Sequence, residues 1–228
     1  MITTKTTIPQ LVLILSVSLL PLTVCAQTPT LGVWAGAGVE KKLGKSFSVE
    51  LNGQMRVSDN FSITRAYLGE VGVGYRLTKH WKIGAFYRYT GRRKFNKETL
   101  DYYYRPYHRF YGELSYDHKL WRGLKADYRL RYQDQFKDDT EGLVADKSYI
   151  RNKFELSYDF KTRFTPFASA DIFYRIGTGI DQVRSKIGVD IDLTKRQSLS
   201  VSVFTDVPVN AEPITEVFGN VGYKFKIK

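Results

Sequence analysis

The stretch Gly123–Phe136, GLKADYRLRYQDQF, alternates strictly between two kinds of side chain. One set is apolar or aromatic and the other is charged or polar: Leu124, Ala126, Tyr128, Leu130 and Tyr132 against Lys125, Asp127, Arg129, Arg131 and Gln133. Because successive side chains of a β-strand point to opposite faces, the pattern predicts a strand with one apolar face. The opposite face carries charges of both signs, so it must meet water or a polar interior.

The same alternation recurs along the whole chain. Eleven candidate strands can be read, at 31–41, 46–58, 63–77, 81–93, 106–119, 124–137, 148–160, 163–176, 181–193, 197–207 and 214–227. Strands this long exceed the roughly five or six residues usual in globular sheets. They suit a tilted strand that crosses a bilayer. In lipid every backbone polar group must be paired, so such a sheet has to close into a barrel.

The connections between these strands alternate in length, as they do in outer-membrane barrels with short periplasmic turns and longer outer loops. Short basic turns recur at 41–45, 78–80, 120–123, 161–163 and 194–197, and longer polar links at 58–62, 91–105, 137–147, 177–181 and 207–213. Aromatic residues lie near both kinds of connection and predict two interfacial girdles: Phe47, Trp81, Trp121 and Phe164 beside the short turns, and Tyr89, Phe110, Tyr132, Tyr149 and Tyr174 towards the long links.

These observations predict an all-β fold, a transmembrane antiparallel up-and-down β-barrel of about 10–12 strands. A soluble β-sandwich or lipocalin-like barrel is the alternative, but its apolar face looks inward and its turns recur every ~8–12 residues. The strand count stays open, because single-chain bacterial barrels have even numbers. Leu31–Lys41, with three glycines, would leave ten strands if it were tucked inside, and Gly91–Arg105 would supply a twelfth.

The first 26 residues have the pattern of a cleaved signal peptide: a positive start at Lys5, an apolar run at 8–24, and a cleavage site at Val24-Cys25-Ala26. Lipidation of Cys25 is the alternative. The remaining 27–228 are predicted to form a single barrel domain without cysteine. Removing Lys5 changes the formal charge from +12 to +11. A basic exported chain favours outer-membrane lipid and lipopolysaccharide as partners, and no nucleic-acid motif is present.

Several phrases resemble a known family of bacterial outer-membrane proteins. They are YRPYHRFYGELSY, YRLRYQDQF and YIRNKFELSYDFKTRFTPFASADIFY, together with VEKKLGKSFSVELNGQMR near the start and VGYKFKIK at the end. The chain is similar over Trp34–Lys228 to the domain-of-unknown-function 2490 family (DUF2490), which is widespread in Bacteroidetes. The resemblance implies a barrel integral to the outer membrane of a Gram-negative bacterium, with no established activity. The machinery that assembles such barrels usually recognises an aromatic residue at the C-terminal position. Here that position is Lys228, and Phe225 is expected to serve instead.

No catalytic, cofactor or metal site is predicted. Barrel-type lipid deacylases and phospholipases carry a histidine and a serine two positions apart, whereas Lys82, Phe110 and Leu120 stand two positions after His80, His108 and His118. An omptin-type protease needs Asp and His at the extracellular rim of its barrel. Asp117 and His118 are adjacent but lie beside a short turn, at the predicted periplasmic end. The KDDTEG segment at 137–142 lacks the spacing of a calcium loop.

The polar face of the strands is therefore the candidate site. Its predicted charge network contains Arg88, Arg109, Glu113, Asp127, Arg129, Arg131, Arg151, Lys153, Glu155, Asp171, Arg175, Arg184 and Asp190. A non-enzymatic barrel with a largely packed lumen, and a structural role or a protein partner in an envelope complex, is the first interpretation. A porin-like narrow channel for small anionic solutes is the second. A lipid-modifying enzyme is the third.

Overall fold

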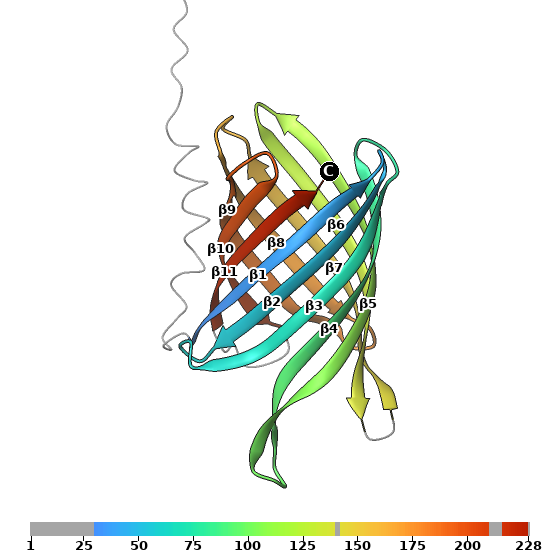
Figure 1. Ribbon diagram of the computed structural model, residues 1–228, viewed down its shortest axis with the longest axis vertical. Coiled ribbons are helices and arrows are strands. Elements are labelled where there is room, and N and C mark those ends of the chain that lie inside the picture. The colour runs from blue at the N-terminus through green and yellow to red at the C-terminus, as the bar shows by residue number, and fades with distance from the viewer. Residues whose placement is uncertain (1–29, 140–141, 210–215, 228) are drawn as a thin grey trace, which may run out of the picture.

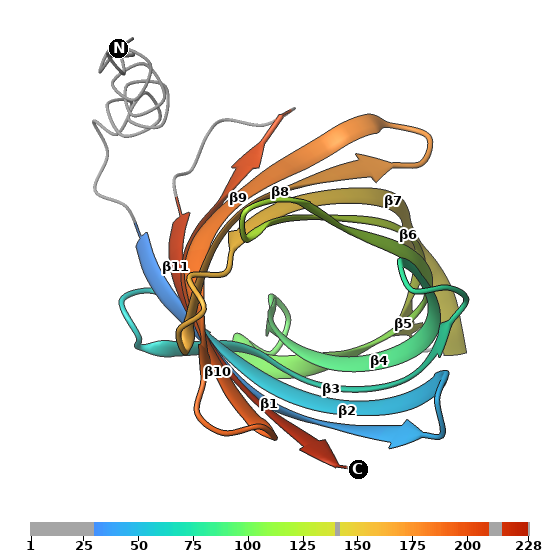
Figure 2. The same cartoon turned by 90° about the horizontal axis from the view of Figure 1, so that it is seen from above.

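The structure is a computed structural model that describes residues 30–139, 142–209 and 216–227. Within these ranges eleven strands form one closed barrel (Figures 1 and 2). They are β1 (Thr30–Leu43), β2 (Phe47–Ser58), β3 (Ile63–Arg76), β4 (Trp81–Asn96), β5 (Asp101–Trp121), β6 (Leu124–Asp139), β7 (Gly142–Tyr158), β8 (Phe164–Arg175), β9 (Gly179–Asp192), β10 (Gln197–Pro208) and β11 (Glu216–Ile227). The prediction of an all-β barrel is confirmed, and the predicted leader lies outside the described residues.

Neighbouring strands run antiparallel in chain order, and one parallel seam between β1 and β11 closes the barrel. Pairing along the seam extends from Thr30 opposite Glu216 to Lys41 opposite Ile227. An odd number of strands makes such a seam unavoidable, since the first and last strands then point the same way. Neither ten nor twelve is therefore right: the count within the described residues is eleven.

The segment 31–41 lies in the wall, and its glycines explain why it was read as irregular. A Cβ at Gly32 would lie 2.6 Å from the Phe218 ring, and one at Gly38 would overlap the Asn52 amide. These positions are bare because side chains of the neighbouring strands cover them on the inner face. The glycines make room in the lumen and leave the strand's hydrogen bonds intact.

Residues 91–105 form neither a loop nor a separate strand. They continue β4 and β5 as a paired hairpin, from Gly91 opposite Pro106 to Asn96 opposite Asp101. This β4–β5 hairpin projects far beyond the rim in Figure 1, and its tip lies within the outline of the barrel when viewed along the axis in Figure 2. The Tyr104 hydroxyl donates to the Thr64 carbonyl at 2.9 Å and ties its base to β3. The predicted link at 137–147 likewise continues β6 and β7.

The two ends of the barrel differ in their long hairpins and not at every connection. The predicted longer links at 58–62 and 177–181 are turns of 59–62 and 176–178, no longer than those at the other end. The end with turns at 44–46, 77–80, 122–123, 159–163 and 193–196 is called the short-turn end, and the opposite one, where the β4–β5 and β6–β7 hairpins project, the long-hairpin end. The β5–β6 turn shows why a short turn can be this tight. Arg122 and Gly123 have φ values of 41° and 89°, which matches the left-handed pair that a two-residue hairpin requires.

The outer and inner faces of the wall have opposite character. Large apolar side chains are exposed on the outside, among them Leu51, Met55, Val71, Val73, Ile83, Phe110, Leu130, Phe154, Leu156, Ile187, Val203 and Val221. Inside lie buried aromatic, amide and charged groups. Among the described residues no helix has the length and apolarity to cross a membrane.

Candidate functional site: the lumen

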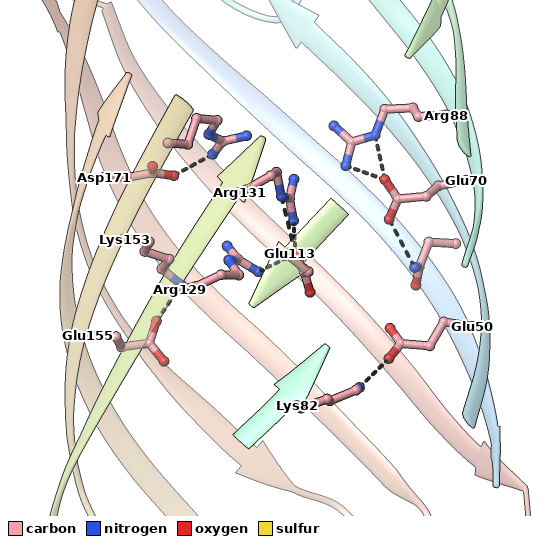
Figure 3. Close-up of polar contacts among 12 residues, drawn as sticks. Glu50, Glu70, Lys82, Arg88, Glu113, Arg129, Arg131, Lys153, Glu155 and Asp171 are labelled. Atoms are coloured by element: carbon pink, nitrogen blue, oxygen red, sulfur yellow. Dashed lines mark hydrogen bonds and ion pairs between the residues drawn. The ribbon is translucent and has the colours of Figure 1, made fainter. Parts of the chain in front are cut away.

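The inner face of the barrel carries a set of ion pairs, most of which join different strands (Figure 3). The pairs are Arg88–Glu70, Arg131–Glu113, Arg151–Asp171, Lys153–Glu155, Arg184–Asp206, Lys125–Asp127, Lys82–Glu50 and Lys224–Glu40. Alternation places these groups on one face, and the strand register then decides which of them meet. Glu70 lies directly opposite Arg88, for example, and Glu113 directly opposite Arg131.

Glu113 on β5 is a lumen carboxylate that faces two arginines of β6. The Arg131 guanidinium donates to Glu113 Oε2 through Nη2 at 2.7 Å and through Nε at 3.2 Å. A second guanidinium, that of Arg129, lies 3.9 Å from the same oxygen. The Arg131 guanidinium also covers the Tyr111 ring at 3.9 Å from its centroid. One carboxylate therefore compensates two arginines in a buried, aromatic environment.

A second buried cluster joins strands on the seam side of the lumen. Trp34 packs against Phe204 and Phe218, with ring centroids 4.7 and 5.6 Å apart. Arg56 stacks on the Trp34 ring at 3.7 Å, and Arg184 lies over the same ring at 4.8 Å. Cation–π contacts of this kind are strongest where water is excluded. The cluster ties β1, β2, β9, β10 and β11 together inside the barrel.

The structure brings most of the predicted charge network together. Arg88, Glu113, Asp127, Arg129, Arg131, Arg151, Lys153, Glu155, Asp171 and Arg184 all take part in ion pairs. Arg109 instead donates to the Gln135 amide oxygen, and its Nε is buried without a partner. Asp190 is exposed in the cavity at the short-turn end. Arg175 lies at the far end of β8, opposite Tyr149 and Gly179.

The sequence reasoning overlooked several members of the lumen. Asp206, the partner of Arg184, was missed although its parity on β10, shared with Phe204, would have placed it inside. Trp34 was not included in the network, which was drawn from charged residues. Glu70, the partner of Arg88, was also left out of the predicted network.

Most of the predicted girdle residues lie on the outer surface near an end of the barrel, namely Phe47, Trp81, Trp121 and Phe164 at the short-turn end and Tyr89, Phe110, Tyr132 and Tyr174 at the other. Tyr149 does not belong with them. It lies opposite the fully buried Gln133, its hydroxyl donates to Asp181 at 2.8 Å, and its ring meets Phe173. Its neighbour Ile150 takes the outward position opposite Tyr132, so Tyr149 must face the lumen.

A cavity of about 740 Å³ opens at the short-turn end, beside β5 to β9. Its lining includes Lys125, Asp127, Arg129, Lys153, Glu155 and Asp190. Basic and acidic groups are mixed there, and those on β6 and β7 bind each other two residues apart along one strand, as in Lys125–Asp127 at 2.8 Å and Lys153–Glu155 at 2.6 Å.

The three histidines contact neighbouring rings and polar groups. The His80 Nδ1 atom lies 2.8 Å from the Asp117 carbonyl, and its ring contacts His118 and Tyr116. The Tyr87 hydroxyl lies 2.7 Å from His108 Nδ1, while His108 Nε2 is 3.5 Å from Asp138. Across the described ranges no group of three or more His, Cys, Asp or Glu side chains could hold a metal ion. Glu141, part of the acidic segment noted in the sequence, lies outside them.

A model of a family described as "Protein of unknown function (DUF2490)" matches residues 31–206, which is more than half of the chain. The chain belongs to the DUF2490 family. No curated protein matches its sequence. Among solved structures, the DUF2490 chain is similar to the β-domain of the Bordetella autotransporter BrkA, with 12% identity, a TM-score of 0.49, and coverage of 79% of this chain and 82% of that one.

Proposed function

We propose that this DUF2490 protein is a non-enzymatic outer-membrane barrel whose lumen is occluded, so that it acts as a structural or interaction component of the envelope. In a diffusion pore water reaches the lumen-facing side chains. Here the middle of the lumen is filled from many strands: Gln133 is 1% exposed, Phe218 2%, Phe204 3% and Arg131 7%. This burial is the observation that carries the proposal.

The number of strands supports occlusion. Barrels of about eight strands fill their interior with side chains, while those of 16 to 18 leave a channel. Eleven strands fall near the filled end, and this lumen contains bulky stacked groups, with the Phe86 and Tyr111 rings 4.8 Å apart and Trp34 against Phe204. Paired charges pack against these rings, as Arg131 does over Tyr111.

Location in the outer membrane is part of the proposal, and its support is the outer face. A continuous band of exposed aliphatic residues with aromatic residues towards both ends is the surface that a bilayer covers. Lipid and lipopolysaccharide are then the immediate surroundings, with the long hairpins outside and the short turns in the periplasm. Barrel-assembly machinery, acting on the C-terminal strand β11, is the proposed partner during biogenesis.

Single cysteines test this orientation. A membrane-impermeant maleimide should label Glu98→Cys at the tip of the β4–β5 hairpin in intact cells, and Lys195→Cys in the β9–β10 turn only after the outer membrane is permeabilised. The reverse labelling pattern would mean that the barrel has the opposite orientation. Equal labelling of both positions in intact cells would contradict its location in the outer membrane.

Planar-bilayer recording tests occlusion. The purified, folded wild-type barrel should give no discrete conductance steps, because its mid-lumen is filled. A double replacement, Trp34→Ala with Phe204→Ala, removes the two facing rings and should produce openings if the protein still shows the heat-modifiable gel mobility of a folded barrel. Steady conductance of the wild type would reject the occluded lumen.

A narrow channel for small anionic solutes is the second candidate, because the cavity at the short-turn end already opens part of the route. It requires the mid-lumen side chains to move. Anion-selective conductance of the wild type in the same recordings would select it. Catalysis forms no part of the proposal; His80 contacts the Asp117 carbonyl, and His108 contacts the Tyr87 hydroxyl and the Asp138 carboxylate.

A further inference from the structure

Four arginines gather on the lumen wall in the half nearer the long-hairpin end, and they are called here the arginine cluster: Arg56 on β2, Arg88 and Arg92 on β4, and Arg109 on β5. Register places them together. Arg88 lies opposite Arg109, while Arg92 and Arg56 both lie opposite Ala66 on β3. The Arg56 guanidinium is repelled by those of Arg88, Arg109 and Arg92.

Only one member of the cluster has a carboxylate partner within the described part of the chain. Arg88 binds Glu70, with its Nε 2.5 Å from Oε2. Arg56 donates to the Gln54 amide oxygen at 2.9 Å, and Arg92 stacks over Tyr107 at 4.8 Å. For these two, and for Arg109, no carboxylate oxygen of the described residues lies within ion-pairing distance.

Arg109 is the member with a free donor. Its Nη2 donates to Gln135 Oε1, and the Gln135 amide in turn donates to Asp146 at 2.5 Å. The Arg109 Nε–H is buried and has no acceptor among the described residues. Leaving a buried donor without a partner destabilises the fold, because the group has lost its hydrogen bonds to water. An acceptor bound beside this cationic side chain would remove that penalty.

The remaining positive charge cannot be removed by proton loss, because a guanidinium stays protonated in proteins. Amide oxygens and aromatic rings reduce the repulsion but do not neutralise it. Partial exclusion of water strengthens it. A bound anion would relieve the repulsion between the guanidinium groups. A phosphate group fits best, because each planar guanidinium can donate two parallel hydrogen bonds to its oxygens.

The mouth above the cluster is also basic. Lys94 lies on the same face of the β4–β5 hairpin as Arg92, and Arg105 lies opposite Arg92. Desolvation and then the charges of Arg92 and Arg105 lower the pKa of the Lys94 ammonium. Arg105 is matched by Asp139 at 3.2 Å, so Arg92 and Lys94 carry the excess positive charge here among the described residues, and such charge attracts anions.

Some cations in the short-turn half of the lumen are matched by carboxylates. Lys82 lies 3.0 Å from Glu50, and Lys125 lies 2.8 Å from Asp127. These paired lysines differ from Arg56, Arg92 and Arg109, and Lys125 can therefore serve as a control.

We propose that the arginine cluster is a binding site for a multivalent oxyanion, a soluble phosphate or phosphorylated small solute that enters from the long-hairpin end and is held chiefly by Arg56, Arg92 and Arg109. The site goes beyond the proposed occlusion and does not depend on it. An occluded barrel would bind the anion without passing it, and a channel would bind it in transit.

Titration of the purified, folded barrel with inorganic phosphate tests the site, by isothermal calorimetry and by thermal unfolding at constant ionic strength in sodium chloride. Phosphate should raise the Tm of the wild type above that in chloride. Arg109→Gln should weaken phosphate binding by about tenfold or more, since it removes a charge-assisted donor. Lys125→Gln, a paired cation at the other end, is the matched control and should keep the affinity within about twofold.

Arg109→Gln also separates an anion site from a merely structural arginine. If the cluster carries uncompensated charge, the variant should unfold at a higher Tm than the wild type without phosphate and should lose the phosphate-dependent rise. A structural role predicts a lower Tm in both buffers, and this result would overturn the proposal. Equal Tm values of the wild type in phosphate and chloride would overturn it as well. If Arg109→Gln does not fold, Arg92→Gln takes its place with the same expectations.

A final arm distinguishes a soluble anion from a lipid phosphate. The barrel is refolded into phosphatidylcholine vesicles with and without lipopolysaccharide, and phosphate is titrated into both. Unchanged affinity supports a soluble ligand. If the affinity for phosphate falls in the vesicles that contain lipopolysaccharide, lipid phosphates occupy the site. This result would overturn the proposal of a soluble ligand.

Discussion

Replacement of Glu113 by Gln is the most direct measurement of what the ion pairs contribute to the barrel. The change keeps the size and shape of the side chain and removes one negative charge. It leaves Arg131, which donates two hydrogen bonds to Glu113, and Arg129 without their shared carboxylate. The Glu113 and Arg131 side chains are 12% and 9% exposed, so water cannot replace the lost partner.

The magnitude follows from burial. Breaking a buried ion pair by removing one partner costs about 3–5 kcal/mol, because the other charge stays buried and uncompensated. The amide oxygen that the substitution introduces still accepts a hydrogen bond from Arg131, which offsets roughly 1 kcal/mol. We therefore expect Glu113→Gln to lower the free energy of unfolding by about 2–4 kcal/mol.

Equilibrium urea unfolding of the barrel in lipid vesicles, followed by tryptophan fluorescence, provides the assay. The matched control is Glu216→Gln, which breaks the Arg65–Glu216 pair at 3.0 Å, where the Arg65 and Glu216 side chains are 50% and 29% exposed. Pairs this exposed contribute about 0–1 kcal/mol. If the two variants lose equal stability, or if Glu113→Gln loses less than about 1 kcal/mol, the lumen is wet and the argument from burial is wrong.

Two further predictions concern the wall. Val71 is exposed on the outer face towards the middle of β3, opposite Leu51 and Tyr87, and should face lipid, so Val71→Arg should cost about 2–4 kcal/mol in the same unfolding assay. Leu100→Arg in the β4–β5 turn should cost under about 0.5 kcal/mol, and equal losses would mean that Val71 faces water. Gly72→Ala would overlap the Phe86 ring and should cost about 1–3 kcal/mol, whereas Gly69→Ala meets open space and serves as its control. A neutral Gly72→Ala would mean that the ring moves freely.

Much of the architecture could be read from the sequence because side-chain alternation is a local property. The opening stretch behaves as predicted: Leu130 and Tyr132 are exposed outside, and Arg131 and Gln133 are buried inside. The predicted segments needed changes only at their ends. The hairpin extension at 91–105 was misread because its polar and basic composition is typical of a loop, whereas pairing between β4 and β5 keeps it extended.

The partners within the lumen could not be predicted, since they depend on register and on distances around the barrel. Arg184 meets Asp206 because β9 and β10 pair with these two residues directly opposite each other. Lys82 reaches Glu50 across the whole width of β3, over the bare Gly74. No sequence spacing indicates a contact of the second kind, and the arginine cluster was invisible for the same reason.

The odd strand count also bears on the side chains that line the β1–β11 seam. Parallel pairing is slightly less stable per residue than antiparallel pairing, so the β1–β11 seam is the weakest ladder of the wall. Side chains reinforce it from inside and at its ends. Trp34 on β1 packs against Phe218 on β11, and Lys224 binds Glu40 across the seam at 2.8 Å.

The same Trp34 ring is a main part of the occlusion, through its contact with Phe204 and its two stacked arginines. Closing the barrel and filling its lumen are therefore served by one cluster. A variant that opens the lumen by removing Trp34 should also weaken the seam, so conductance and loss of stability should appear together. Replacement of Phe86, which lies on β4 away from the seam, should loosen the lumen while leaving the seam's contribution to stability intact.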